Sequence, residues 1–358
     1  MKIKICLFLL LFLLATSLLP YSVLWVGGVG EPLQQASARG VGMGGVSIAI
    51  PYHTAELNPA CMSLQKTSLA LTGVQEAVYS SSEEVGVTSY DFRLPALCVA
   101  FPLPWAATVH ARYAQTISAD FALSRDDTIP GEPDVPYVHE LSRDGSITSL
   151  SVGLSKSIHP VTVGLRGCMD FGSFLDVQRI DFQSGNYQDS YDELTREFNG
   201  FTYEIGILCE LASLSIGGCY RAKNELGSDL TFPLSYGIGA SYSLGRTLIG
   251  LDYATSLWKQ TDEDYDDART VALGCEYTMG LSKLRGGYRH SSSYYNQIKE
   301  HMVTAGIGFP LRTENGGIEL AMEVGMRSDT DQELEEKLVR FAFTFWGLEK
   351  WEKRTTYP

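Results

Sequence analysis

Strict alternation of apolar and polar residues is the feature that most constrains the fold of this chain. Residues 234–244 read Leu-Ser-Tyr-Gly-Ile-Gly-Ala-Ser-Tyr-Ser-Leu, so the larger apolar side chains share one face and only Ser and Gly occupy the other. Successive side chains of a β-strand point to opposite faces, whereas a helix repeats near every 3.6 residues, so this pattern predicts a strand. The alternation recurs at 249–254, 271–277, 318–324 and 339–345. We therefore expect an all-β fold.

The number and spacing of these segments narrow the architecture. Fourteen segments of about nine to fourteen residues start near positions 67, 91, 106, 146, 161, 200, 213, 234, 247, 268, 282, 300, 316 and 336. Tight turns such as His159-Pro160 alternate with longer polar connections such as 120–145 and 176–199. Transmembrane barrels combine an even strand number with short turns at one end and long loops at the other. The sequence thus predicts a transmembrane antiparallel β-barrel of about 14 strands over residues 67–346.

The two faces of the segments differ in the way such a barrel requires. One face is apolar, with aromatic residues near the segment ends, and the other carries small and charged residues. Charges are costly against hydrocarbon, so we expect them to line the lumen. The expected lumen-lining residues are Arg112, Arg166, Asp170, Glu204, Asp252, Glu276, Arg285, Arg289, Glu319, Glu323 and Arg340. An exported β-sandwich, which buries its apolar face between two sheets, is the alternative.

The N-terminus predicts export. Lys2 and Lys4 precede a dense apolar run at 5–14, and small residues follow. This is the pattern of a signal peptide, which we assign to residues 1–26 with an uncertain cleavage site. With 28 basic against 42 acidic residues the net charge is −14, and no basic stripe offsets it, so nucleic acid is not an expected partner.

Residues 27–66 do not alternate and precede the first strand, so we expect a small N-terminal hatch inside the lumen. Its glycines, among them Gly42, Gly44 and Gly45, permit close packing of backbone against the barrel wall. A dinucleotide-binding loop is excluded because no strand precedes these glycines. Pro59 fixes φ and biases Asn58 away from helix, which predicts a kink that either gates the lumen or turns the chain into the first strand.

This hatch region resembles a known family. Gly42-Met-Gly-Gly45, a small apolar stretch and then Asn58-Pro59-Ala60 resemble the N-terminal hatch of FadL-like outer-membrane transport proteins, and they are equally similar to the PorV-like branch. The resemblance implies a fourteen-strand barrel, plugged by a hatch, in the bacterial outer membrane. For the FadL-like branch it implies passive uptake of small hydrophobic, fatty-acid-like molecules. For the PorV-like branch it implies a scaffold or carrier for exported proteins.

The resemblance also suggests which residues serve transport. The expected gate comprises Gly42, Gly44, Gly45, Asn58, Pro59 and Ala60. An apolar ligand pocket in the hatch would be formed by Val46, Ile48, Ile50, Leu57 and Met62, unless these residues merely pack the plug. After Phe345-Trp346 a charged tail, 347–358, follows the last predicted strand.

Catalytic and metal-binding patterns are weak. The six histidines form no cluster with metal-ligand spacing. His290 and Ser292 share the outward face, but no third catalytic group accompanies them. The acidic run 262–267 is better explained as a solvated loop than as a cation site, and the cysteines show no disulfide or zinc spacing. We therefore expect no enzyme, no cofactor and no metal, with membrane lipid and a small hydrophobic ligand as partners.

Overall fold

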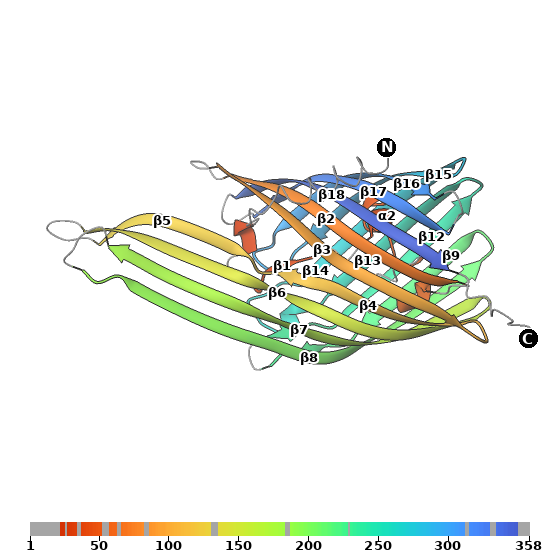
Figure 1. Ribbon diagram of the computed structural model, residues 1–358, viewed down its shortest axis with the longest axis horizontal. Coiled ribbons are helices and arrows are strands. Elements are labelled where there is room, and N and C mark those ends of the chain that lie inside the picture. Colours follow the sequence, from red (N-terminus) through yellow and green to blue (C-terminus); the bar gives the residue numbers. More distant parts are fainter. Residues whose placement is uncertain are drawn as a thin grey trace, which may run out of the picture.

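Fourteen antiparallel strands close into a barrel (Figure 1). The computed structural model describes residues 22–25, 27–33, 37–51, 57–62, 66–81, 86–129, 135–182, 187–227, 230–311, 315–329 and 334–349. The barrel strands are β2 (Thr67–Ser81), β3 (Gly86–Leu103), β4 (Ala107–Ser118), β6 (Val135–Ile158), β7 (Val161–Phe182), β8 (Ser190–Leu211), β9 (Leu214–Arg221), β12 (Ser235–Leu244), β13 (Thr247–Ser256), β14 (Ala268–Met279), β15 (Ser282–Ser292), β16 (Lys299–Pro310), β17 (Gly316–Ser328) and β18 (Glu335–Glu349). Each pairs with the next barrel strand, and β18 pairs with β2 to close the sheet. The predicted transmembrane barrel is confirmed.

Apolar and charged side chains lie on opposite faces of the strands, as the alternation predicts. On β13 and β17 the apolar residues Leu251 and Val324 are 52% and 43% exposed, whereas the neighbouring Asp252 and Glu323 are 4% and 0% exposed. The exposed apolar residues therefore form an outward band for lipid, and the charges point inward. The tight turns bring the strands back with one residue in left-handed backbone, such as Gly245 at φ 59° and Gly280 at φ 64°.

Two segments predicted as loops are strands instead. The connections 120–145 and 176–199 contain β5 (Phe121–Ile129) and the outer parts of β6, β7 and β8, which project well beyond the other strands (Figure 1). Pairing continues along them, for example between Tyr137 and Phe182. The alternation was undetectable because both faces of this four-stranded sheet, which we call the outer extension, carry exposed polar residues.

The remaining elements are short. They are the turns η1 (Val23–Trp25), η2 (Pro59–Cys61) and η3 (Trp258–Gln260), the helix α2 (Ala38–Gly42), and the two-residue strands β1 (Glu31–Pro32), β10 (Asn224–Glu225) and β11 (Thr231–Phe232). β1 pairs with β4, and α2 packs against β16, β17 and β18. Among the described residues, no helix combines the length and the apolar character needed to cross a membrane.

The structure bears on the predicted bounds of the signal peptide and of the C-terminal tail. η1 lies within the predicted signal peptide, and Leu24 and Trp25 are buried in the largest apolar cluster. β18 extends to Glu349, three residues past the predicted end of the barrel. The remainder of the predicted tail lies outside the described residues, as do 1–21 of the predicted signal peptide.

Candidate functional site

The N-terminal segment is seated against the inner wall of the barrel by close backbone contact. Gly44 adopts φ 71°, and a Cβ built on it would lie 2.7 Å from the backbone nitrogen of Tyr288. A Cβ on Gly287 would lie 2.4 Å from the nitrogen of Gly44, and one on Gly42 would lie 3.1 Å from Cα of Gly306. Only glycine fits such spacing on both sides of the contact. The stretch containing Gly42, Gly44 and Gly45 therefore packs on glycines of β15 and β16.

Two side chains hold the next part of this segment. Asp252 on β13 accepts hydrogen bonds at Oδ2 from the backbone nitrogens of Ser47 (2.6 Å) and Ile48 (2.8 Å). Asn58 donates through Nδ2 to the carbonyl oxygens of Ile48 (2.8 Å) and Ile207 (3.0 Å), and its Oδ1 accepts from the nitrogen of Ala60 (2.9 Å). Asn58 thus links Pro59 and Ala60 in η2 to both the 46–50 segment and β8.

A charge network fixes α2 to the wall. Arg39 Nε lies 2.9 Å from Glu276 Oε2, and Arg285 Nε lies 2.8 Å from the same oxygen. Arg285 also binds Glu319 at 3.0 Å, and Lys283 binds Glu276 at 3.0 Å. Buried charges require such pairing, so these predicted lumen residues form a satisfied network rather than an open polar channel.

A second network lies further toward the outer end and joins the neighbouring strands β15 to β18 to β1. Glu300 accepts from Arg327 Nε (2.6 Å) and Arg289 Nη2 (2.8 Å), and Arg327 also binds Glu31 of β1 at 2.5 Å. Glu323 joins Arg289 (2.5 Å) to Arg340 (3.2 Å).

The third network lies on the other side of the barrel. Arg166 and Arg221 share Glu204, and Arg221 binds Asp170 at 2.5 Å. Arg112 is buried nearby on β4 and its carbonyl accepts from Ser151 at 3.3 Å. The structure therefore places all eleven predicted lumen residues in the interior, almost all of them in these three networks and Asp252 on the hatch.

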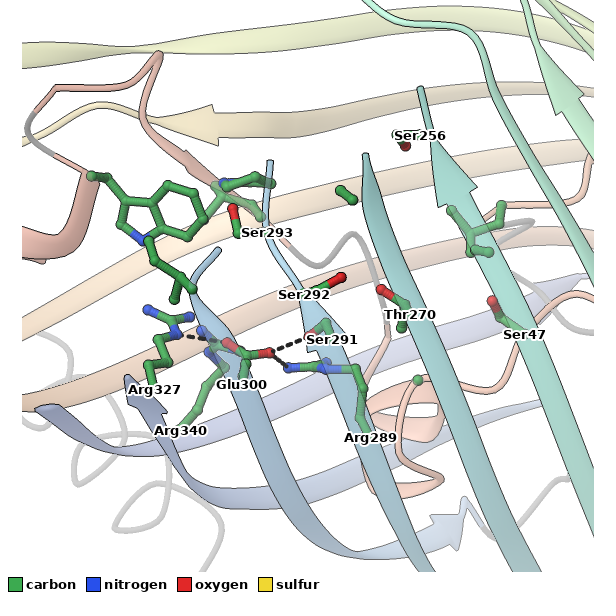
Figure 2. A pocket seen from close by; sticks show the side chains of 18 residues that line it. Ser47, Ser256, Thr270, Arg289, Ser291, Ser292, Ser293, Glu300, Arg327 and Arg340 are labelled. Carbon is green, nitrogen blue, oxygen red and sulfur yellow. Dashed lines mark hydrogen bonds and ion pairs between the residues drawn. The ribbon is translucent and has the colours of Figure 1, made fainter. Parts of the chain in front are cut away.

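A cavity of about 320 Å³ lies between the N-terminal segment and the wall formed by β13 to β18 (Figure 2). Its polar side carries Ser47, Ser256, Thr270, Ser291, Ser292, Ser293, Arg289, Glu300, Arg327 and Arg340. Its apolar side is formed by Trp25, Pro32, Leu33, Leu57, Ala254, Ala268 and Ile298. Glu300 is fully engaged by two arginines and by the Ser291 hydroxyl at 3.1 Å. The wall consequently offers hydroxyl groups and apolar surface rather than a free charge.

An aromatic cap closes the outer side of this region. Trp258 stacks on Tyr294 with ring centroids 4.2 Å apart, and Trp25 lies 5.6 Å from the same ring. The Tyr294 hydroxyl donates to the carbonyl of Gly30 (2.9 Å) and accepts from the nitrogen of Val29 (3.0 Å). Tyr294 lies in the loop between β15 and β16, where burial raises the pKa of its hydroxyl far above the ordinary 10, so it stays protonated.

Most residues of the predicted hatch pocket do not line the cavity. Of its five residues only Leu57 lines the cavity. Val46 and Ile50 pack against Ala272 of β14 and Met62 packs against Cys98 and Ala100 of β3. Ile48 is fully buried against β12, where a Cβ on Gly237 would lie 2.7 Å from its Cδ1. Glycines on the barrel wall have no side chain and leave hollows there. Val46 and Ile48 fill such hollows, so these side chains pack the plug and do not form a ligand pocket.

Several site residues were not predicted. Trp25 fell within the predicted signal, and the cavity serines carry no distinctive local pattern. Arg327 was detectable, because it has the inward parity of Glu319 and Glu323 on the same strand. His290, predicted to face outward, lies beside the exposed His301, whereas Ser292, predicted on the same face, lines the cavity because it is the last residue of β15, where the alternation ends. Within the described ranges, no group of three or more His, Cys, Asp or Glu side chains is placed to hold a metal, and the six cysteines there are free.

Comparison with known proteins gives the fold its context. No protein-family model and no curated protein sequence matches the chain. The structure is similar to that of the Ralstonia pickettii toluene transporter TbuX, with a TM-score of 0.70 and 13% identity over 89% of this chain and 99% of that one. It is similar to the Pseudomonas putida toluene transporter TodX, with a TM-score of 0.65 and 13% identity over 89% and 100%. The monoaromatic hydrocarbon channel CymD gives a TM-score of 0.62 at 11% identity over 89% and 99%. The chain therefore has the fourteen-strand fold of FadL-like outer-membrane channels.

Proposed function

We propose that this protein is a bacterial outer-membrane channel for passive uptake of small hydrophobic molecules. The observation that carries the proposal is the cavity between the N-terminal segment and β13 to β18, roofed by the aromatic cap. Hydrophobic ligand sites combine apolar lining with a few polar groups that orient the ligand, and this cavity has both. The similarity to toluene and hydrocarbon channels supports the same class of solute.

The size of the cavity favours a compact solute over a long acyl chain. A dry cavity of about 150 Å³ is sufficient to bind benzene. The cavity here, at about 320 Å³, accommodates a single substituted aromatic ring. Trp25 and Ile298 provide an apolar surface, and Thr270 and Ser292 add hydroxyl groups to the same lining. We therefore favour a molecule of monoaromatic size over the fatty-acid-like ligand that the resemblance implies.

In this proposal the hatch residues act as a gate. The Gly42, Gly44 and Gly45 stretch seals against β15 and β16, and Asp252 and Asn58 hold the following segment. A solute leaving the cavity toward the inner end would pass this segment, which is buried against β12 to β16. Gating is then a shift between seated and displaced positions.

The mature chain in this proposal starts before residue 22. Ser22 donates to both oxygens of Glu336, at 3.0 and 2.9 Å, and Trp25 is part of the cavity. A signal cleavage site after residue 26 would remove both, so we place it earlier. N-terminal sequencing of the protein purified from outer membranes tests this boundary.

Uptake by proteoliposomes tests the channel. Ala254 lines the cavity, so Ala254→Phe should fill part of it and reduce uptake of radiolabelled toluene, because the phenyl ring occupies volume that the solute needs. Ala305 is exposed on the outward face of β16, so Ala305→Phe is the matched control and should leave uptake unchanged. Equal uptake by both variants, with folding verified by heat-modifiable migration, would overturn the proposal.

One observation supports a second candidate function, a scaffold for exported proteins. The outer extension projects beyond the barrel, and within the described residues β5 pairs only with β6, which leaves one strand edge open. Edge strands are common sites of protein association. Replacing residues 122–141 by a short turn should abolish co-purification of an exported partner if the protein is a scaffold. Unchanged toluene uptake by the same variant would separate the two functions.

A further inference from the structure

Basic side chains gather on the lipid-facing side of the barrel, where β14 to β18 leave the apolar band at their outer ends. Strand alternation defines their direction: Tyr288 and Val303 are exposed, whereas their neighbours Arg289 and Met302 are buried. By the same parity the next outward positions, which we call the basic rim patch, are Arg269, His290, Lys299, His301 and Lys337. They follow the exposed Tyr288, Val303 and Val324 toward the outer ends of the strands, where a transmembrane barrel passes from its apolar band to the headgroup region.

The registers bring the five side chains together. His290 and His301 are cross-strand partners with ring centroids 4.4 Å apart. Ser292 is the register partner of both Arg269 and Lys299, so these two bases are two strands apart, roughly 10 Å at the backbone. Met326 is likewise the partner of both His301 and Lys337. Arg269 on β14 and Lys337 on β18 therefore flank Lys299 and the imidazole pair along the outer ends of the strands.

Arg269, Lys299 and Lys337 differ from the inward arginines of the same strands in their ion pairing. Arg285, Arg289, Arg327 and Arg340 point inward and each binds carboxylates. For Arg269, Lys299 and Lys337 no ion pair is formed within the part of the chain that the structure describes. The outward acid in this register is Glu335, which is two residues from Lys337 and two strands from Lys299, and Asp267, two residues before Arg269, ends the acidic run 262–267. In a chain of net charge −14, an outward patch with surplus positive charge indicates an anionic partner in the surroundings.

The imidazole contacts leave hydrogen-bond donors for that partner. His290 Nδ1 lies 3.2 Å from the carbonyl oxygen of Glu300, which can only accept, so Nδ1 carries a proton. His301 Nδ1 lies 2.7 Å from the Tyr288 hydroxyl. When that hydroxyl donates, the ring proton of His301 is on Nε2. The pair therefore supplies an N–H group between the flanking cations.

We infer that the basic rim patch binds the phosphate of an anionic phospholipid in the leaflet that surrounds the outer end of the barrel. The inference rests on the transmembrane placement but not on the solute that the channel carries. Phosphate accepts several hydrogen bonds and is favoured by clustered cations, and the acyl chains of the same lipid would lie along the exposed Val303 and Val324 below. A bound lipid would pin β14 to β18, the strands that form the cavity wall.

Titration of detergent-purified protein with phosphatidylglycerol, followed by native mass spectrometry, tests the inference. A cation near a membrane surface contributes roughly a fivefold gain in affinity, so Arg269→Gln/Lys299→Gln/Lys337→Gln should weaken binding on the order of 100-fold. Glu335→Gln should strengthen it. The matched control removes the same charge elsewhere: Arg125, Arg179 and Lys223 are exposed and paired with carboxylates, and their triple glutamine variant should bind normally.

Two results would overturn the inference: equal loss in both triple variants, or equal affinity of the wild type for phosphatidylglycerol and phosphatidylcholine. Heat-modifiable migration of each variant shows that the barrel is folded. Toluene uptake by the same variants is measured separately, so a channel that carries no toluene but retains the lipid would overturn only the proposed function.

Discussion

Asp252→Asn is the sharpest test of how the hatch is held. Asp252 Oδ2 accepts two backbone N–H groups, from Ser47 at 2.6 Å and Ile48 at 2.8 Å, and the carboxylate is 4% exposed. Asparagine retains the shape and one acceptor oxygen but removes the charge. A hydrogen bond to a charged group contributes about 1.5–3 kcal/mol and a neutral one about 0.5–1.5 kcal/mol. The substitution should therefore destabilise the seated segment by about 2–3 kcal/mol in total.

Hydrogen exchange measures this change directly. A loss of about 2–3 kcal/mol corresponds to exchange about 30 to 150 times faster at the amides of Ser47 and Ile48. Passive permeability of reconstituted protein should rise with it if the segment is a gate. The control is Asp170→Asn, since Asp170 is a buried lumen carboxylate that binds Arg221 and Asn224 rather than the hatch. Unchanged exchange at Ser47 and Ile48 in Asp252→Asn would refute the anchoring, and faster exchange without altered permeability would refute the gate.

Three further predictions concern the wall, the cap and the outer extension. Leu251→Arg or Val324→Arg should cost roughly 2–4 kcal/mol in urea unfolding from liposomes, whereas Ala321→Ser on the lumen side should cost far less, and equal costs would contradict the face assignment. Tyr294→Phe should leave the carbonyl of Gly30 and the nitrogen of Val29 without their partner, so the amide of Val29 should exchange roughly tenfold faster or more; no change would show that the cap does not depend on the hydroxyl. Burial and the neighbouring Asp144 raise the pKa of Asp120, between β4 and β5, from 3.8 to about 6. Because the folded state holds this proton more tightly, its stabilising contribution is complete below about pH 4 and is lost as the pH rises through about 6. The free energy of unfolding in urea should therefore fall over this range, and Asp120→Asn should remove that part of the pH dependence.

Alternation along single strands was sufficient to determine the barrel. Each strand of a membrane barrel separates lipid from lumen, so residues such as Leu251 and Asp252 report their side independently of any partner. Asp252, Glu276 and Arg340 were identified as interior for this reason. The same rule fails at 120–145 and 176–199, because a sheet that is exposed on both faces has no reason to alternate.

Only the tertiary structure decided which side chains contact one another in the interior. The sequence indicated a glycine-rich hatch, but which side chains meet depends on the register of strands far apart in the chain: Arg39 meets Glu276, Asp252 meets Ser47, and Trp25 meets Tyr294. Val46 and Ile48 are apolar whether they line a pocket or fill a hollow, and only the glycines opposite them decide between the two. Local pattern determines which face a residue takes, whereas closure of the barrel determines which residue it meets there.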